Sequence, residues 1–179
     1  MKRWHIVGRK NHGKTGLVVD LVRELTRRGL RIGTIKHTHH RHELDTPGKD
    51  SHDHRLAGAA AVGIISPGLN AVFFPRDPQL PHDDNRAYGE LGPVFAACDL
   101  VLVEGDLHAE APKVEVWRSA AGGEPLAAKD SAILAVVSDD APEISVPVLS
   151  RCDVPAIADW LLRQEAKEAG GAADAACHV

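Results

Sequence analysis

Residues 8–15 read Gly-Arg-Lys-Asn-His-Gly-Lys-Thr and match the pattern G-x-x-x-x-G-K-[S/T] at every fixed position. The run follows the apolar stretch Trp4–Val7 and precedes a segment with helical apolar spacing. A phosphate-binding loop of this kind lies between a strand and a helix. In that position its backbone N–H groups and the N-terminus of the helix point toward one anion. The sequence therefore predicts a strand–loop–helix unit that binds the phosphates of a nucleoside triphosphate.

The residue types in this loop indicate separate roles. Glycine lets the backbone turn closely around phosphate, where a Cβ would clash. Lys14 is expected to reach the β- and γ-phosphates, and the Thr15 hydroxyl is expected to bind Mg²⁺. The residues expected to contact the nucleotide are Gly8, Lys10, Asn11, His12, Gly13, Lys14, Thr15, Gly16, Lys36 and His37.

The composition is that of an ordinary globular protein. A chain of 179 residues with 44% hydrophobic and 26% charged residues fits one domain with a sizeable core. A formal net charge of −4 gives no general attraction to nucleic acid or anionic membranes. No stretch is long and apolar enough to span a bilayer, and no apolar signal-peptide region follows Met1, so a cytoplasmic protein is expected. The cysteines at 98, 152 and 177 are far apart and odd in number, which predicts reduced thiols.

Apolar periodicity alternates between strand and helix along the chain. Helices are expected over residues 17–25 (with Gly29 as C-cap), from 50 or 51 to about 60, 87–98 and 154–168, and strands over 4–7, 30–36, 62–66, 71–74, 99–104, 114–116 and 132–137. This order predicts a doubly wound α/β fold with a mostly parallel sheet, the P-loop NTPase fold, and a ligand at the carboxyl ends of the strands. Residues 1–168 are expected to form a single nucleotide-binding domain, and the Ala/Gly-rich tail 169–179 is expected to be flexible.

Glu104 ends the most continuous apolar run of the chain. A carboxylate at the end of a buried strand can face the phosphate-binding loop across the strand ends and hold Mg²⁺ together with Thr15. Asp99 is less suitable because it begins the same strand, at the opposite edge of the sheet. The alternative is that Glu104 is a solvated acid at a strand terminus.

Residues 36–55 hold six of the eleven histidines. Imidazoles are good zinc ligands, but the segment has no H-E-x-x-H and no cysteine partner, so the sequence predicts no zinc site there. In a second interpretation, Lys36, Lys49 and Arg55 surround phosphate oxygens while Asp45 or Asp50 positions Mg²⁺ or water. The candidate catalytic residues are then Lys14, Glu104 and Asp50.

Several pieces of the sequence together resemble the MobB family, the molybdopterin-guanine dinucleotide biosynthesis protein B. They are the loop itself, Ile35-Lys36-His37-Thr38-His39-His40, Asp45-Thr46-Pro47-Gly48-Lys49-Asp50-Ser51, Arg55-x-Ala57-Gly58-Ala59, and Val101-x-Val103-Glu104-Gly105 with Lys113. The resemblance implies a GTP-binding protein with weak GTPase activity that needs Mg²⁺ and is usually a homodimer. It also implies that the protein assists a MobA-like nucleotidyltransferase in attaching GMP to molybdopterin. The chain departs from the family pattern in its bulky loop interior, at Gly16, and at Asp106, where an aromatic residue is usual.

Two other functions fit the same loop. A P-loop kinase or ligase for a small metabolite would need a lid, for which Arg76 and Arg86 in the segment 75–86 are the candidates. A non-hydrolytic adaptor would use the nucleotide only to order a partner surface. Neither N-K-x-D nor T-K-x-D, the motifs that indicate guanine binding, occurs in the sequence, so the preference for GTP over ATP rests on the resemblance. Residues 137–140 can nevertheless place a carboxylate near a guanine edge.

The strand pair within 62–74 offers an edge for dimerisation.

Overall fold

The computed structural model describes residues 1–38, 43–74 and 84–176. Its contacts divide the chain into two compact units, which we call the main unit (Met1–Thr38 with Asp84–Val179) and the insert unit (His39–Asp83). A single domain over residues 1–168 is the expectation from the sequence, and this division into units was not part of it. In the part of the chain that is described, no helix is both long and apolar enough to cross a membrane.

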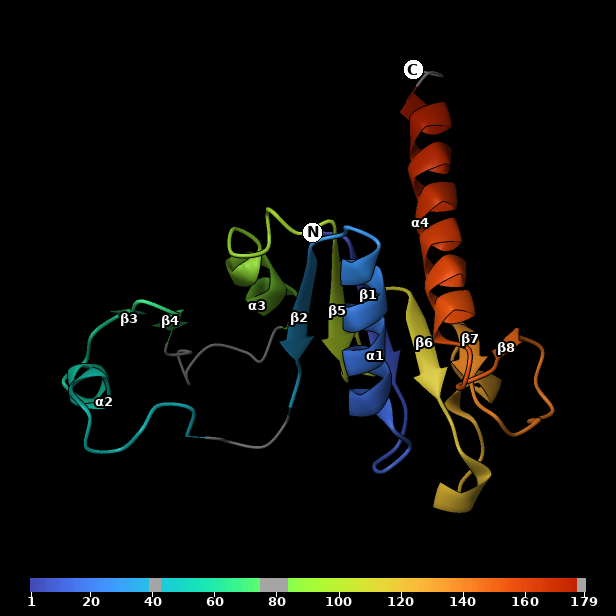
Figure 1. The fold of residues 1–179 in the computed structure, drawn as a ribbon, viewed down its shortest axis with the longest axis horizontal. Helices are drawn as coiled ribbons and strands as arrows, with labels where there is room; N and C mark the ends of the chain where they lie inside the picture. Colours follow the sequence, from blue (N-terminus) through green and yellow to red (C-terminus); the bar gives the residue numbers. More distant parts are fainter. Residues whose placement is uncertain (39–42, 75–83, 177–179) are drawn as a thin grey trace. The chain divides into compact units, whose positions relative to one another are not determined.

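The main unit contains a six-stranded sheet in the order β2-β5-β1-β6-β7-β8, and every neighbouring pair is parallel. The strands are β1 Arg3–Val7, β2 Ile32–Lys36, β5 Leu100–Glu104, β6 Lys113–Val116, β7 Ile133–Val137 and β8 Val148–Leu149. The arrowheads of β2, β5 and β6 point the same way in Figure 1, and the loop between β1 and α1 lies at that end. The predicted parallel sheet is thus confirmed, with the short β8 as an unexpected edge.

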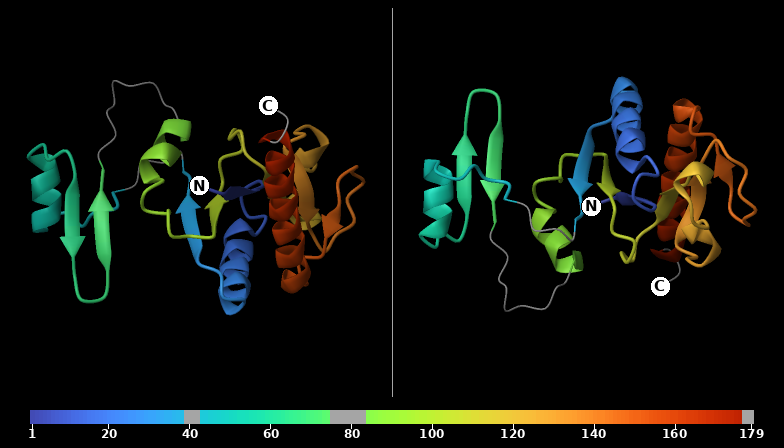
Figure 2. Two further views of the ribbon diagram at one scale, coloured as in Figure 1. Left: turned by 90° about the horizontal axis from the view of Figure 1, so that it is seen from above. Right: turned by 90° about the horizontal axis from the view of Figure 1, so that it is seen from below.

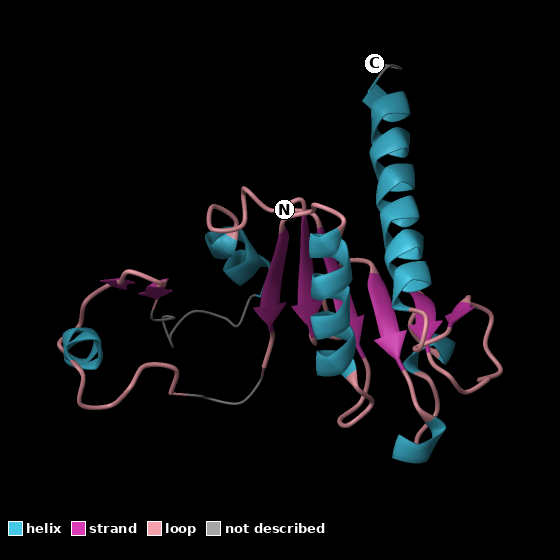
Figure 3. Ribbon diagram, in the orientation of Figure 1, coloured by secondary structure: helices cyan, strands magenta, loops and turns pink. Residues whose placement is uncertain are grey.

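Helices cover both faces of this sheet. They are α1 Lys14–Arg27, α3 Asp84–Leu91 and α4 Val154–Ala176, with short 3-10 turns η1 Ser119–Ala121 and η2 Leu126–Ala128. Figure 2 shows α1 and α3 on opposite sides of the sheet, and Figure 3 separates the helices from the strands by colour. This arrangement confirms the doubly wound prediction.

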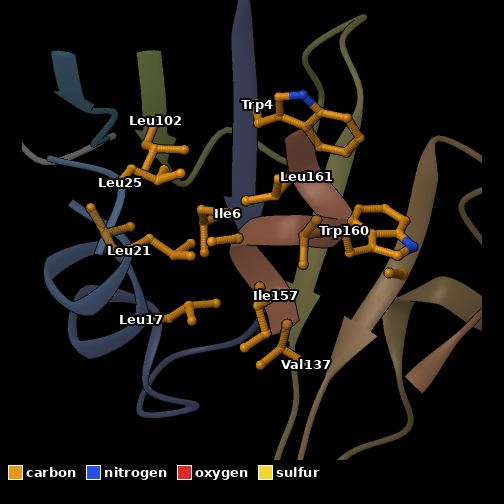
Figure 4. Packing of buried hydrophobic residues seen from close by; sticks show 14 of the residues in the cluster. Trp4, Ile6, Leu17, Leu21, Leu25, Leu102, Val137, Ile157, Trp160 and Leu161 are labelled. Carbon is orange, nitrogen blue, oxygen red and sulfur yellow. The ribbon is translucent and has the colours of Figure 1, made fainter. Parts of the chain in front are cut away.

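Strand β5 is apolar at four successive positions because both of its faces are buried. Leu100 and Leu102 join the larger core with α1 and α4, while Val101 and Val103 pack with Tyr88 of α3 on the other face. Figure 4 shows the larger core between the sheet and the two helices. A parallel strand that is covered on both sides has no solvent-facing position before its end, so Glu104 is its first polar residue.

Helix α1 is amphipathic and ends as expected. Leu17, Leu21 and Leu25 are fully buried at a spacing of four residues. Gly29 adopts a φ of +87°, and its N–H donates to Thr26 O at 2.9 Å while the N–H of residue 30 donates to Leu25 O at 3.2 Å. These two bonds form a Schellman motif, which accounts for glycine at this position.

Helix α4 runs eight residues beyond the predicted end at 168. Alanine has the highest helix propensity, and each added residue extends a helix that has already nucleated. The helix is anchored near its start by an edge-to-face contact between Trp160 and Trp4, with ring centroids 5.5 Å apart. Trp4 also donates from Nε1 to Glu165 Oε1 at 2.5 Å.

The helix predicted over 87–98 was wrong in its bounds. Helix α3 ends at Leu91, and residues 92–98 continue as turns. Gly92 and Pro93 explain this end, because proline lacks the N–H that a continuing helix needs. Cys98 and Cys152 are free thiols as predicted, and Cys177 lies outside the described residues.

The insert unit holds helix α2 (Asp50–Leu56) and an antiparallel hairpin of β3 (Val62–Ile65) and β4 (Asn70–Phe73), which confirms the predicted strand pair. The helix begins one residue after an extended Lys49 without any side-chain cap, so the predicted cap by Asp50 or Ser51 is wrong. It also ends before 60. Large apolar side chains of the hairpin region stay exposed: Ile65 (90%), Leu69 (72%), Val72 (53%) and Phe74 (53%).

Candidate functional site

The loop between β1 and α1 has the left-handed backbone that a phosphate cradle requires. Gly8, Asn11 and Gly13 have φ values of +137°, +67° and +99°. Such conformations turn successive N–H groups toward one concave side, where they can bind an anion. A Cβ on Gly8 would lie 2.4 Å from the carbonyl oxygen of Val116, so this glycine is also needed for the close approach of β6.

The side chain of Lys14 forms hydrogen bonds with the backbone of its own loop. Its Nζ donates to Gly8 O and to Arg9 O, both at 2.8 Å. Partial burial lowers the pKa of the Lys14 ammonium below its ordinary value, and Lys36 adds to this shift while the Glu104 carboxylate opposes it. The ammonium is therefore held against the backbone of the loop by two carbonyl groups.

Thr15 and Glu104 meet at the mouth of the loop. The Thr15 hydroxyl donates to Glu104 Oε1 at 2.6 Å, and Lys36 Nζ lies 3.7 Å from the same oxygen. Sheet register explains this meeting, since Glu104 pairs with Ile6 on one side and with Lys36 on the other. The structure thus brings together three residues that the sequence analysis selects from separate segments.

A groove of about 420 Å³ opens beside this pair. Its wall is mainly apolar, with Val18, Val19, Val22 and Ile35 among the lining residues, and Thr15, Lys36 and Glu104 also line it. The groove provides room for a second molecule next to the phosphate-binding loop.

Arg118, which the sequence analysis missed, also lies at the loop. A Cβ on Gly13 would be 3.2 Å from Arg118 Nη2, and the Arg118 N–H donates to His12 Nδ1 at 3.2 Å. No described carboxylate pairs with this guanidinium. The ring of His12 is fully buried, so its expected contact with phosphate is limited to its backbone N–H. The only sign of Arg118 in the sequence is that a basic residue follows β6, the strand that pairs with β1.

The other predicted nucleotide contacts lie in different surroundings. Lys10, Asn11 and Gly16 are exposed around the loop. The His37 ring faces Asp84 at the start of α3, with Nε2 3.2 Å from Oδ2. Asp50 is exposed at the first position of α2 in the insert unit, so its catalytic role stays a prediction.

Several other candidate groups are held by local partners. Arg55 donates to Glu43 Oε1 at 2.6 Å within the insert unit, and Arg86 pairs with Glu90 along α3. Asp139 Oδ1 accepts from the Ser150 hydroxyl, and Asp140 Oδ2 accepts from the N–H of residue 119. Arg76, His39 and His40 lie outside the described residues.

Comparison with known proteins identifies the relatives of this chain. The model of the family Molybdopterin guanine dinucleotide synthesis protein B matches residues 4–139, which is most of the main unit's sheet and the whole insert unit. The chain belongs to the MobB family. Members of this family with the same P-loop NTPase fold include a MobB homologue from Bacillus stearothermophilus, whose crystal structure superposes with a TM-score of 0.65 at 28% identity, covering 92% of this chain and 97% of that one.

Two curated MobB relatives are similar over nearly their whole length. The molybdopterin-guanine dinucleotide biosynthesis adapter protein of Escherichia coli (strain K12) is 36% identical over 166 residues, covering 88% of this chain and 90% of the relative. The protein of the same name from Haemophilus influenzae is 33% identical over 158 residues, covering 87% and 85%. The resemblance noted in the sequence is thus confirmed at the level of the family.

Replacing Gly8 by alanine is expected to disturb this site. The new Cβ would meet the backbone oxygen of Val116, which cannot rotate away, and alanine is strained at a φ of +137°. We expect Gly8→Ala to lower the free energy of unfolding in urea by about 1–3 kcal/mol. Gly89→Ala is the matched control, because Gly89 lies in α3 with open space around it, and it should be neutral or stabilising by about 0.5–1 kcal/mol. Equal stability of the two variants would contradict the packing described for Gly8.

Proposed function

We propose that this protein is a cytoplasmic GTP-binding accessory protein of molybdenum-cofactor maturation, with weak GTPase activity. In this proposal it assists a MobA-like nucleotidyltransferase in attaching GMP to molybdopterin. Membership of the MobB family supports the pathway, since its curated relatives are named adapter proteins of molybdopterin-guanine dinucleotide biosynthesis. The observation that carries the nucleotide-binding part is the contact of Thr15 with Glu104 beside a complete phosphate-binding loop.

Phosphate binding is assigned to the loop backbone and to two cations. The N–H groups of residues 11–15 face the anion, and Lys14 exchanges its bonds to Gly8 O and Arg9 O for bonds to the β- and γ-phosphates. The Arg118 guanidinium lies close enough to the loop to add a second positive charge. Binding of a triphosphate thus replaces neutral carbonyl acceptors of Lys14 by anionic phosphate oxygens, which bind an ammonium more strongly.

Mg²⁺ binding is assigned to Thr15 and Glu104. Mg²⁺ prefers oxygen ligands at about 2.0–2.1 Å in an octahedron, in which adjacent ligands are about 2.9 Å apart. The two side-chain oxygens are already 2.6 Å apart, so they fit adjacent positions after a small separation. Bound Mg²⁺ would neutralise phosphate charge, and Lys36 would balance the remaining charge of Glu104.

We expect slow hydrolysis from this set of groups. Lys14 and Glu104 act on the phosphates and the metal, and neither is placed to position an attacking water by the contacts seen here. Fast GTPases use a separate residue for that water. Asp50 stays our candidate for this role because of its carboxylate.

The function is tested by adding this protein to a MobA-like enzyme with molybdopterin and GTP. We expect the parent protein to increase formation of the dinucleotide and the Lys14→Ala variant to give no increase. The GTP affinity of Lys14→Ala, measured by calorimetry, should fall about ten- to a hundredfold, because hydrogen bonds to a charged group are lost. Lys129→Ala is the control, because Lys129 is exposed and its ion-pair partner is Glu124, which lies outside the loop sequence.

Each rival gives a different result in the same assay. A phosphorylated metabolite formed without molybdopterin would indicate a kinase, and stimulation by a non-hydrolysable GTP analogue equal to that by GTP would indicate an adaptor that does not hydrolyse. Unchanged GTP affinity of Lys14→Ala would overturn the assignment of the phosphate-binding loop. ATP bound as tightly as GTP would remove the preference for guanine.

Glu104→Gln separates a metal role from a structural role. Glutamine keeps the size of the side chain and its ability to accept from Thr15 but removes the negative charge. GTP affinity without Mg²⁺ should therefore change little, while the Mg²⁺-dependent part of the affinity should fall by about 1–3 kcal/mol and hydrolysis should slow. Mg²⁺ titrations followed by calorimetry measure this difference, with Glu124→Gln as an exposed control. Identical titration curves for Glu104→Gln and the parent would show that Glu104 is only a solvated strand-end acid.

We also propose that the protein is a homodimer joined through the β3–β4 hairpin. A two-stranded hairpin is marginally stable alone, and this one leaves Ile65 and Leu69 largely exposed to water, so a second copy would bury them. Ile65→Lys should convert a dimer to a monomer in sedimentation equilibrium. Leu44→Lys, at a residue 78% exposed in the same unit but outside the hairpin, should leave the dimer intact. A parent protein that stays monomeric, or a dimeric Ile65→Lys variant, would contradict this interface.

A further inference from the structure

Three potential metal ligands from distant parts of the sequence converge in the main unit. His37 follows β2, Asp84 begins α3, and Asp106 lies two residues beyond β5. One ligand atom from each, an imidazole nitrogen and two carboxylate oxygens, lies within 4.8 Å of the others. This cluster is separate from the phosphate-binding loop, because Asp106 contacts α3 whereas Glu104 contacts α1.

The cluster is largely buried and its members are held in place. Asp106 is 6% exposed, and the side chain of His37 is 12% exposed. The buried Tyr88 hydroxyl donates to Asp106 Oδ2 at 2.7 Å, and the backbone N–H of His37 donates to Glu104 O at 2.9 Å. The first bond orients the Asp106 carboxylate, as outer-shell groups do in metal sites, and the second fixes the backbone that carries His37.

The surroundings of the buried Asp106 carboxylate are the strongest indication that the cluster binds a cation. Within the part of the chain that the structure describes, no lysine or arginine lies in ion-pair distance of this carboxylate, and its hydrogen-bond partner is the neutral hydroxyl of Tyr88. The neighbouring Arg3 instead lies over the Tyr88 ring, 4.5 Å from its centroid. Buried carboxylates in proteins are paired with a cation or coordinate a metal, because an isolated buried charge is costly.

We propose that His37, Asp84 and Asp106 bind one divalent transition-metal cation of the Zn²⁺ type. One imidazole with two carboxylates suits Zn²⁺ better than Mg²⁺ or Ca²⁺, which prefer oxygen ligands alone. Three protein ligands leave a fourth position for water. The cation joins the end of β2 to the start of α3, the two points at which the chain leaves the main unit for residues 39–83 and returns.

This site differs from a zinc site made by the His-rich segment 36–55 alone, which the sequence does not predict. Spacing within the His-rich segment gives no ligand pair, whereas the proposed site takes only His37 from that segment. Its other two ligands lie 47 and 69 positions further along the chain, as their residue numbers show. No motif search based on local spacing can detect such a set.

The test is calorimetric titration of the full-length, untagged, chelator-treated protein with ZnCl₂ in the absence of nucleotide. We expect one Zn²⁺ per chain. Asp106→Asn should weaken this binding at least tenfold, because asparagine can still accept from Tyr88 but carries no charge. His37→Gln should do the same at a less buried position, and circular dichroism of both variants checks that they are folded. Tyr88→Phe should keep the stoichiometry and weaken affinity by about tenfold, since it removes only the group that orients Asp106.

Matched controls exclude binding by other histidines. His54→Gln and Asp53→Asn change exposed residues of α2 and should leave Zn²⁺ affinity unchanged. Substitution of Co²⁺ gives an independent reading, since its visible absorption should change on Asp106→Asn if Asp106 is a ligand. Equal Zn²⁺ affinity of Asp106→Asn and the parent, or loss of binding only when His39 and His40 are replaced, would overturn the proposal. These titrations contain no GTP, so their result is independent of the proposed function.

Discussion

Parallel pairing of β1 with β5 is the interaction on which the candidate site depends. Its register sets Ile6 opposite Glu104, and the N–H of Gly105 donates to Ile6 O at 3.0 Å. Because β1 leads into the phosphate-binding loop and β5 ends in Glu104, two segments separated by 89 residues place a hydroxyl and a carboxylate side by side. Strand β2, on the other side of β5, brings Lys36 to the same edge. Without this strand order, the loop would hold phosphate with no acid beside it.

The end of β5 also separates two chemically different environments. Glu104 meets Thr15 on the side of α1, and the chain then turns through left-handed Gly105 (φ +95°) and Asp106 (φ +60°) so that Asp106 meets Tyr88 on the side of α3. Hydroxyl and carboxylate oxygens on the first side suit Mg²⁺, whereas the second side adds an imidazole. The ligand types, rather than distance alone, would therefore keep the two proposed cations apart.

Local rules predicted the parts of the fold that local forces determine. The loop, the amphipathic α1 with its end at Gly29, and the doubly apolar β5 follow from residue period and from glycine's backbone freedom. The errors came where local preference is weak or two preferences compete. The two-residue strand β8 is too short to have a period, α3 stops before Gly92-Pro93 despite apolar residues beyond, and α4 continues through alanine past its expected end at residue 168.

The sequence by itself determined the loop motif after β1, the family and the place of Glu104 at the end of an apolar strand, because each is visible in short local stretches of residues. Only the tertiary structure placed Arg118 beside Gly13 and gathered His37, Asp84 and Asp106 into one cluster. The physical reason is that parallel strands are joined by long crossovers, so neighbours in the sheet are distant in the sequence. The order β2-β5-β1-β6, which decides these neighbours, results from packing of both sheet faces against helices and leaves no periodic signal in any one segment.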